Sequence, residues 1–393
     1  MAMKTVCNFL ISAVRAALTD CKAQQPPENF DWNRFAKLTK RHKVSAIVSS
    51  GLYASGIVPP KEIKDKLELE TSLFLLLDVN QKTAAAELFQ GFESHRLAYM
   101  PMKGYNIKKF YPKSYMRYMC DIDILIDDSR YAEYSSVMAD LGYVEENESD
   151  HEHIFTKKPL INIELHKRIV PSYDTDLYGY YGDGWSKAEK ASGEYGYSYS
   201  GENQYIYLVV HLAKHYRSAG IGLIHFIDLY VINSKTQYDR GYIDSELKNL
   251  GLYEFHQNIL KLLGVWFCGS EDDKTTAAMT RHIFLSGAYG NAQNRAAAET
   301  LRGVKKYGNK KASHRAKKME MIFPSPKALS ESFPVLKKHP ALYPFLLLFR
   351  NVRALLFRRK KATDYMEKIK PADEKQTDML ASHLEDVGLK NKE

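Results

Sequence analysis

The residues best suited to chemistry in this chain are two aspartates one residue apart, Asp121 and Asp123, in the apolar stretch CDIDILI. Side chains at positions i and i+2 of a strand leave the same face, so the carboxylates point together while Ile122, Ile124 and Ile126 point to the core. Such a pair repels unless a cation lies between its members, and hard oxygen ligands suit Mg²⁺ or Mn²⁺. The spacing predicts a divalent-metal site; a strand end with two solvated acids is the alternative.

A candidate phosphate-binding turn precedes the aspartates. A strand expected over 97–102 is followed by Gly104, which opens a short helix expected over 105–110. A glycine in the first turn of a helix lets a phosphate approach backbone N–H groups, and the helix dipole favours the anion. Lys103 and Arg117 add positive charge on either side, so these two residues and Gly104 are predicted to bind phosphate.

A third acid is available in LINIELHKRI, residues 160–169, which alternates like a strand. Ile161, Ile163 and Leu165 take one face, and Asn162, Glu164 and His166 take the other. Glu164 on a neighbouring strand could complete a carboxylate triad with the aspartate pair. The alternative is that Glu164 is an ordinary solvated strand residue.

Taken together, these motifs resemble the bacterial nucleotidyltransferase-like family of the DNA polymerase β superfamily. The resemblance rests on K-G, then R, then DIDILI, then IELH, and it extends to the flanking stretches DWNRFAKLTKRHKV, ENQYIYLVVHLAKH and IFPSPKALSESFPVLKKHPALYPFLLLFRNVR. It implies that Asp121 and Asp123 are the metal-binding pair, that Glu164 is the third carboxylate, and that Lys103 and Gly104 form the phosphate turn. A Lys-Gly-Tyr turn replaces the Gly-Ser of better understood relatives, and Glu replaces the more usual Asp at the third position.

Two functional classes follow. The first is a metal-dependent nucleotidyltransferase that moves a nucleoside monophosphate from an NTP, with ATP the expected donor, to a hydroxyl acceptor and releases pyrophosphate. In it, Asp121 and Asp123 would bridge two Mg²⁺ or Mn²⁺ ions, and Glu164 would hold the ion nearer the acceptor. The second is a non-catalytic nucleotide- or anion-binding protein that keeps the fold. The sequence names neither the acceptor nor the preferred base.

Composition favours a globular protein of a reducing compartment. The chain has 393 residues and 45% hydrophobic content, enough for two or three packed units. Its four cysteines have no C-x-x-C spacing, which favours the cytoplasm and argues against structural zinc. The longest apolar runs, such as residues 344–349, are far below the roughly 20 residues that span a bilayer, so we expect no transmembrane segment. The first residues read as an amphipathic helix with no signal peptide, whose inward residues are Val6, Phe9, Leu10 and Val14.

The expected fold is α+β, with a small mixed β-sheet of the polymerase β type between helical N-terminal and C-terminal parts. A long helix over 71–96 leads into the first strand, and the Tyr- and Gly-rich stretch 173–199 predicts a loop or hairpin. The division we expect is a helical part over 1–97, the sheet core over 98–170, a connecting region over 171–200, a helical part over 201–361 and a polar, weakly periodic tail over 362–393.

Other features are left without a role. His211 and His215, in HLAKH, are one helical turn apart, but no glutamate of the zinc-protease type lies between them. We expect core or phosphate-facing histidines there, and a buried partner for Asp228 in the apolar stretch HFIDLYVI. The charge of +9 is concentrated in residues 302–318 and 358–361. Nucleic acid, anionic lipid or an acidic partner could bind them, and a solvated linker and helix end is the alternative; without a recognisable module we expect no sequence-specific nucleic-acid binding.

Overall fold

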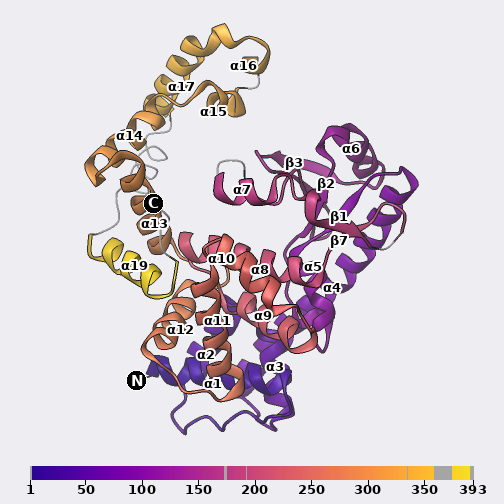
Figure 1. The fold of residues 1–393 in the computed structure, drawn as a ribbon, viewed down its shortest axis with the longest axis vertical. Helices are drawn as coiled ribbons and strands as arrows, with labels where there is room; N and C mark the ends of the chain where they lie inside the picture. The colour runs from indigo at the N-terminus through magenta and orange to yellow at the C-terminus, as the bar shows by residue number, and fades with distance from the viewer. Residues whose placement is uncertain (1, 172–174, 192, 334, 358–373, 390–393) are drawn as a thin grey trace. The chain divides into compact units, whose positions relative to one another are not determined.

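The computed structural model describes residues 2–171, 175–191, 193–333, 335–357 and 374–389 (Figure 1). The chain divides into two compact units. Unit 1 comprises Met1–Lys214, Ile221–Ala288 and Val387–Leu389, and unit 2 comprises His215–Gly220, Tyr289–Asp386 and Lys390–Glu393. Unit 1 holds the sheet and the helices around it, which confirms the expected α+β class.

The elements run in the following order along the chain. The helices are α1 (Ala2–Leu18), α2 (Trp32–Arg41), α3 (Ser45–Ala54), α4 (Lys61–Ser94), α5 (Lys103–Ile107), α6 (Tyr131–Asp140), α7 (Thr175–Tyr181), α8 (Gly201–Ser218), α9 (Leu223–Lys235), α10 (Arg240–Asn249), α11 (Tyr253–Leu263), α12 (Lys274–Ser286), α13 (Ala292–Tyr307), α14 (Lys310–Ile322), α15 (Pro326–Ser332), α16 (Val335–Lys338), α17 (Tyr343–Phe357) and α19 (Glu374–Asp386). The strands are β1 (Tyr99–Pro101), β2 (Ile122–Ile126), β3 (Val144–Glu148), β4 (Glu152–Lys157), β5 (Ile161–His166), β6 (Ala188–Lys190) and β7 (Tyr197–Tyr199).

The main sheet has five strands in the order β1-β2-β5-β4-β3, and it is mixed because β2 and β5 run parallel while the other pairs are antiparallel. One face is apolar. It packs on α4 and α6 through a buried cluster that includes Leu88, Phe92, Tyr134, Ile124 and Ile163. The opposite face of β2 and β5 therefore carries the polar residues, as the alternation of side chains predicts.

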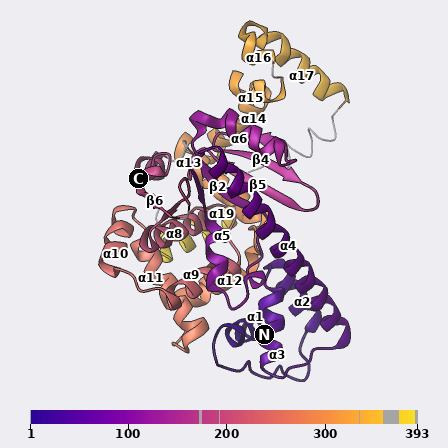
Figure 2. The same ribbon diagram turned by 90° about the vertical axis from the view of Figure 1, so that its right-hand side faces the viewer.

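Helix α4 connects the N-terminal helices to the sheet (Figures 1 and 2). It begins at Lys61, ten residues before the start expected from the sequence, since its first turns pack on α2 and α3. Its buried Asp78 and Gln81 both accept hydrogen bonds from Lys108 Nζ, at 2.8 and 2.9 Å, and Gln81 donates to the Met119 carbonyl. These bonds fix the segment that leads from β1 to β2.

The amphipathic N-terminal helix is confirmed, because Val6, Phe9, Leu10 and Val14 are all buried. In the stretch expected to be loop or hairpin, β6 and β7 form a two-stranded antiparallel hairpin, preceded by α7. The backbone N–H of Tyr99 in β1 donates to the carbonyl oxygen of Tyr195, which lies between β6 and β7.

Unit 2 corrects two expectations. The basic residues 302–318 lie mostly in α13 and α14 and do not form a linker, whereas 358–361 lie outside the described residues. Residues 374–386 form α19, whose Thr377, Leu380 and Leu384 are buried at helical spacing, so the expectation of a weakly periodic tail is wrong there. The short segment Val387–Leu389 belongs to unit 1.

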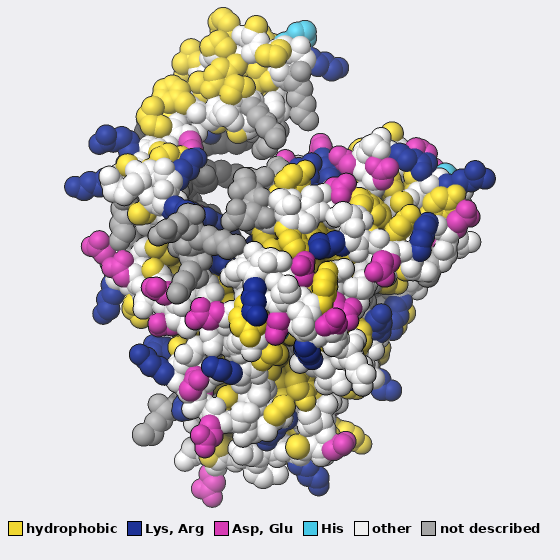
Figure 3. Space-filling model, in the orientation of Figure 1, with side chains coloured by type: hydrophobic (Ala, Val, Ile, Leu, Met, Phe, Trp, Pro, Cys, Tyr) yellow, Lys and Arg dark blue, Asp and Glu magenta, His cyan; other side chains and the backbone are white. Residues whose placement is uncertain are grey.

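The apolar run 344–349 lies in α17. Hydrophobic side chains gather over α15–α17 in Figure 3, with Phe345, Leu348 and Phe349 exposed. Across the described part of the chain, every helix is too short or too polar to cross a membrane.

Candidate metal and nucleotide site

The parallel pairing of β2 with β5 places the predicted acids side by side. Asp123 is the direct partner of Glu164 in the register, and Leu125 is the partner of His166. Side chains of paired positions share a face, so Asp123, Glu164 and His166 all leave the sheet on the side away from α4 and α6. Asp123 is buried and Glu164 is partly exposed, so the site is open to solvent at one edge.

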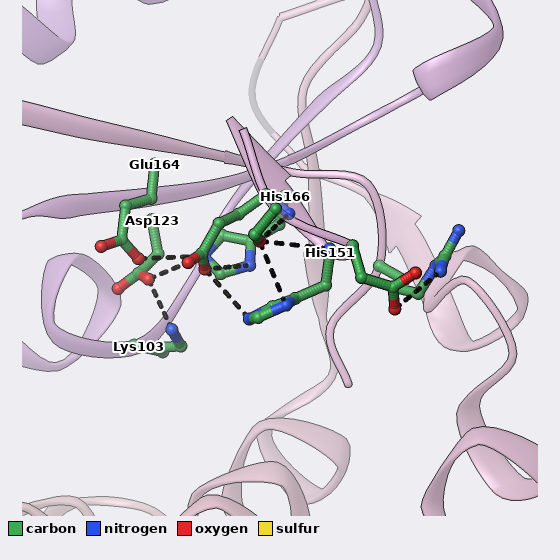
Figure 4. Close-up of polar contacts among 9 residues, drawn as sticks. Lys103, Asp123, His151, Glu164 and His166 are labelled. Carbon is green, nitrogen blue, oxygen red and sulfur yellow. Dashed lines mark hydrogen bonds and ion pairs between the residues drawn. The ribbon is translucent and has the colours of Figure 1, made fainter. Parts of the chain in front are cut away.

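His166 is the site residue that the sequence reasoning did not select. Its Nε2 lies 2.9 Å from Asp123 Oδ1 and 3.4 Å from Glu164 Oε2 (Figure 4). One ligand atom from each of the three residues lies within 4.8 Å of the other two, which is compact enough to hold one metal ion. The signal was present in the sequence, because His166 follows Glu164 by two positions on the same polar strand face.

Asp121 lies one residue before β2 and outside that compact group of ligand atoms. Cys120 Sγ donates to its Oδ2 at 3.1 Å. Burial, together with the negative charges of Asp123 and Glu164, raises the pKa of Asp121 to about 6. Asp121 therefore experiences both neighbouring acids electrostatically, as expected of residues that share one site.

Lys103 occupies the position closest to the acids. Its Nζ donates to Asp123 Oδ1 at 2.5 Å. Burial disfavours the charged form of Lys103, but Asp123, Tyr207 and Glu164 outweigh burial and raise the pKa of the ammonium above its ordinary value. The backbone at Lys103 has φ 47°, a left-handed conformation unusual for a residue other than glycine. The preceding residue, Met102, donates its backbone N–H to the Asp123 carbonyl. This hydrogen bond attaches the turn at Lys103 directly to β2.

The electrostatics of Asp123 are set by two basic partners. Burial opposes its ionisation, but Lys103 and His166 hold the pKa of Asp123 below its usual range. The pKa of His166 is shifted in the opposite direction. Burial and Lys103 lower it, yet the hydrogen bonds to Asp123 and Glu164 leave the His166 pKa raised.

Gly104 follows Lys103 in α5 and is buried. A Cβ at this position would lie 3.0 Å from the sulfur of Met119 and 3.6 Å from the guanidinium carbon of Arg117. Packing alone thus favours a glycine here, and the close approach of a phosphate to its backbone stays a prediction.

Arg117, which we expect to neutralise phosphates, forms a buried ion pair with Asp228, and its contact with a phosphate stays a prediction. Its Nε and Nη2 donate to the Asp228 carboxylate, at 2.8 and 2.7 Å, and Nη1 donates to the Tyr118 carbonyl. Tyr111 adds a hydroxyl hydrogen bond of 2.6 Å to Asp228. The buried partner expected for Asp228 is therefore confirmed. Because all three guanidinium nitrogens are engaged, Arg117 joins α9 to the segment before β2.

His211 and His215 do not belong to the metal-ligand group found among the described residues. The His211 ring on α8 lies 6.0 Å from the His225 ring on α9, and His225 Nδ1 is 4.0 Å from Asp228. A zinc site of the protease type, already disfavoured by the sequence, gains no support from this arrangement.

Comparison with known proteins identifies the family of the chain. A family model described as an uncharacterised nucleotidyltransferase matches residues 28–268, which is more than half of the chain and includes Lys103, Asp121, Asp123, Glu164 and His166. No curated protein and no solved structure matches the chain. The match confirms the resemblance read from the motifs, and the chain belongs to this uncharacterised nucleotidyltransferase family.

Proposed function

We propose that this protein is a metal-dependent nucleotidyltransferase that transfers a nucleoside monophosphate from an NTP, with ATP the expected donor, to a hydroxyl acceptor and releases pyrophosphate. One observation carries the proposal beyond family membership. The carboxylates of Asp123 and Glu164 are paired on one face of the sheet, Asp121 is electrostatically coupled to both, and Lys103 is the permanent cation that forms an ion pair with Asp123. Buried acids in excess of their counter-charges favour a bound cation.

The residues fit Mg²⁺ or Mn²⁺ in both charge and donor type. Asp123 and Glu164, with Asp121 beside them, would hold the ions through hard carboxylate oxygens. When bound, such ions neutralise the triphosphate and lower the pKa of the attacking hydroxyl. Lys103 would exchange Asp123 for a phosphate oxygen, since its ammonium sits on a flexible stem that is 21% exposed.

A non-catalytic binding protein is the second candidate, and the Lys103–Asp123 ion pair favours it. That pair gives Asp123 a positive partner without any metal. Glu164→Gln distinguishes the two candidates. In a transferase, this change should leave the affinity for the metal–NTP complex within a few fold and lower transfer by orders of magnitude, because an ion that acts in the transition state affects rate more than binding.

The test of the proposal uses the full chain, each labelled NTP, Mg²⁺ or Mn²⁺, and a cell extract as the source of acceptor. The intact protein should label an acceptor, and Asp123→Asn should lower labelling at least about a hundredfold while remaining folded. Asp128→Asn, an exposed carboxylate just past the end of β2, is the matched control and should label normally. Near-normal transfer by Asp123→Asn would refute the assignment, and label released only as inorganic phosphate would indicate a hydrolase.

The reaction is proposed for the cytoplasm. No disulfide joins Cys7, Cys21, Cys120 and Cys268, which all lie in the described part of the chain, and this agrees with a reducing compartment.

A further inference from the structure

The imidazole of His166 lies between two carboxylates of the site. His166 is 2% exposed, and its Nε2 is 2.9 Å from Asp123 Oδ1 and 3.4 Å from Glu164 Oε2. Two ligand atoms that each lie about 2.1 Å from one ion are about 3 to 4 Å apart. Both distances therefore match those between ligands of a shared metal ion. Hydrogen bonding alone explains only one of the two short distances, because Nε2 carries at most one proton and faces two acceptors.

The other ring nitrogen supplies an independent observation. Nδ1 of His166 is fully buried, and it has no hydrogen-bond partner among the residues that the structure describes. The nearest carboxylate is that of Glu152, with Oε2 3.9 Å away, about 1 Å beyond hydrogen-bond distance. Glu152 is the cross-strand partner of His166 in the β4–β5 register, and His151 Nε2 lies 3.1 Å from the same oxygen.

His166 and Glu152 are arranged like a metal-binding histidine and the carboxylate that accepts a hydrogen bond from its other ring nitrogen. A histidine bound to metal through one nitrogen normally donates the other N–H to a carboxylate, carbonyl or water, which fixes the tautomer. The Nε2 atom of His166 faces Asp123 and Glu164 (Figure 4). Its Nδ1 atom faces Glu152. The orphaned Nδ1 acquires a function once Nε2 gives its lone pair to an ion, because the ring proton then has to reside on Nδ1.

We propose that His166 Nε2 binds the metal directly, with Glu152 as the outer acceptor for its Nδ1–H, and that the site therefore selects Mn²⁺ over Mg²⁺. The inference rests on the proposed metal-dependent function and narrows it. Mg²⁺ binds mainly oxygen and keeps several waters, whereas imidazole nitrogen suits transition metals. One imidazole nitrogen and two carboxylates therefore form a donor set that suits a transition metal such as Mn²⁺ better than Mg²⁺.

The test uses the full chain and the metal ion alone. Pulsed electron paramagnetic resonance of bound Mn²⁺ should detect coupling to a directly bound ¹⁴N nucleus, and calorimetry should show tighter binding of Mn²⁺ than of Mg²⁺. In His166→Gln, the nitrogen coupling should disappear, and the ratio of Mn²⁺ to Mg²⁺ affinity should fall about tenfold or more. His153→Gln is the control, since this buried histidine of β4 hydrogen-bonds Glu145 and should leave the coupling unchanged.

A second variant covers the case in which His166→Gln fails to fold. Glu152→Gln keeps the ligand nitrogen and should retain the coupling while weakening Mn²⁺ binding about tenfold. Mn²⁺ bound without nitrogen coupling, but lost in Asp123→Asn, would overturn the role of His166 and leave the metal-dependent function intact. Absence of any Mn²⁺ or Mg²⁺ binding, also with a non-hydrolysable NTP present, would overturn both.

Discussion

Two ion pairs, Lys103–Asp123 and Arg117–Asp228, differ in how fully their charges are balanced. Lys103, Arg117 and Asp123 lie on the stretch of chain before and within β2, whereas Asp228 lies on α9. The guanidinium of Arg117 donates two hydrogen bonds from different nitrogens to the Asp228 carboxylate, and the Tyr111 hydroxyl donates a third. Lys103 meets Asp123 through a single nitrogen, and further acids lie on the same face. The balanced pair therefore holds the fold together, whereas the unbalanced pair leaves a place for a ligand cation.

The burial of the four side chains agrees with this difference. The Arg117 and Asp228 side chains are 9% and 3% exposed. The Lys103 side chain is 21% exposed, whereas that of its partner Asp123 is only 5% exposed. A charge with no route to solvent needs a permanent partner, because breaking a buried pair leaves its other member uncompensated. A lysine at the edge of solvent is able to leave its partner.

The largest expected effect comes from removing the balanced pair. Arg117→Met should lower the free energy of unfolding by about 3 to 5 kcal/mol, because Asp228 stays charged and buried. Lys103→Met, the matched change at the other pair, should lower it far less. Urea denaturation followed by circular dichroism measures both. Equal losses in the two variants would remove the distinction between a structural pair and a ligand site.

Removal of the Asp121 charge should raise the free energy of unfolding, in contrast to the loss expected for Arg117→Met. Asp121 has a pKa of about 6 in the folded protein against 3.8 for the ordinary side chain. Between these values the folded state binds more protons than the unfolded state, so this group makes the metal-free protein less stable as pH rises from about 4 to about 6. Asp121→Asn should therefore be more stable than the natural chain at pH 7, by up to about 3 kcal/mol, with no advantage below pH 4.

Denaturation of both proteins at pH 4 and pH 7 in the presence of a chelator measures this difference. Addition of Mn²⁺ at pH 7 should stabilise the natural chain and shrink the advantage of the variant. An Asp121→Asn variant that is less stable than the natural chain at pH 7 without metal would show that the acids of the site are already balanced.

An intermediate effect is expected from Tyr111→Phe, which removes one hydrogen bond to Asp228 and keeps the ring. The loss should be about 2 kcal/mol, typical of a buried hydrogen bond to a charged group. Thermal denaturation of the variant measures it. Because Tyr111 lies outside the acid cluster, affinity for Mn²⁺ should not change. A changed affinity would show that the Arg117–Asp228 pair is energetically coupled to the metal site.

The smallest expected effect concerns ligand binding at the unbalanced pair. In Lys103→Met, the ammonium no longer competes for Asp123, so affinity for Mn²⁺ alone should rise about tenfold. Affinity for the Mn²⁺–NTP complex should fall by a similar factor, because a phosphate contact is lost. Titration calorimetry gives both constants. A fall in both affinities would mean that Lys103 organises the site and does not exchange partners.

Local patterns were sufficient to predict the centre of the site. The alternation in CDIDILI and LINIELHKRI predicted the two strands, and their register pairs Asp123 with Glu164. The same alternation contained His166, which was overlooked because acids alone were sought as ligands. The five-part division of the chain stays a prediction.

Long-range partners could not be read from the sequence. Arg117 and Asp228 are 111 residues apart, and nothing local to either distinguishes a phosphate ligand from a structural ion pair. The helix α19 was missed for a related reason. Its buried positions, Thr377, Leu380 and Leu384, include only two apolar residues, too few for a strong local pattern, and the helix is specified by what it packs against.

The return of Val387–Leu389 to unit 1 sets an order of events during synthesis. Val387 and Leu389 are fully buried, and Gly388 adopts φ 82° so close to α11 that an added Cβ would lie 2.7 Å from the Phe255 nitrogen. A ribosome delivers every residue of the metal site long before it delivers Val387–Leu389. Until Val387–Leu389 is made, the part of unit 1 that buries these residues stays exposed, and transiently exposed surface of this kind makes a nascent chain prone to aggregation.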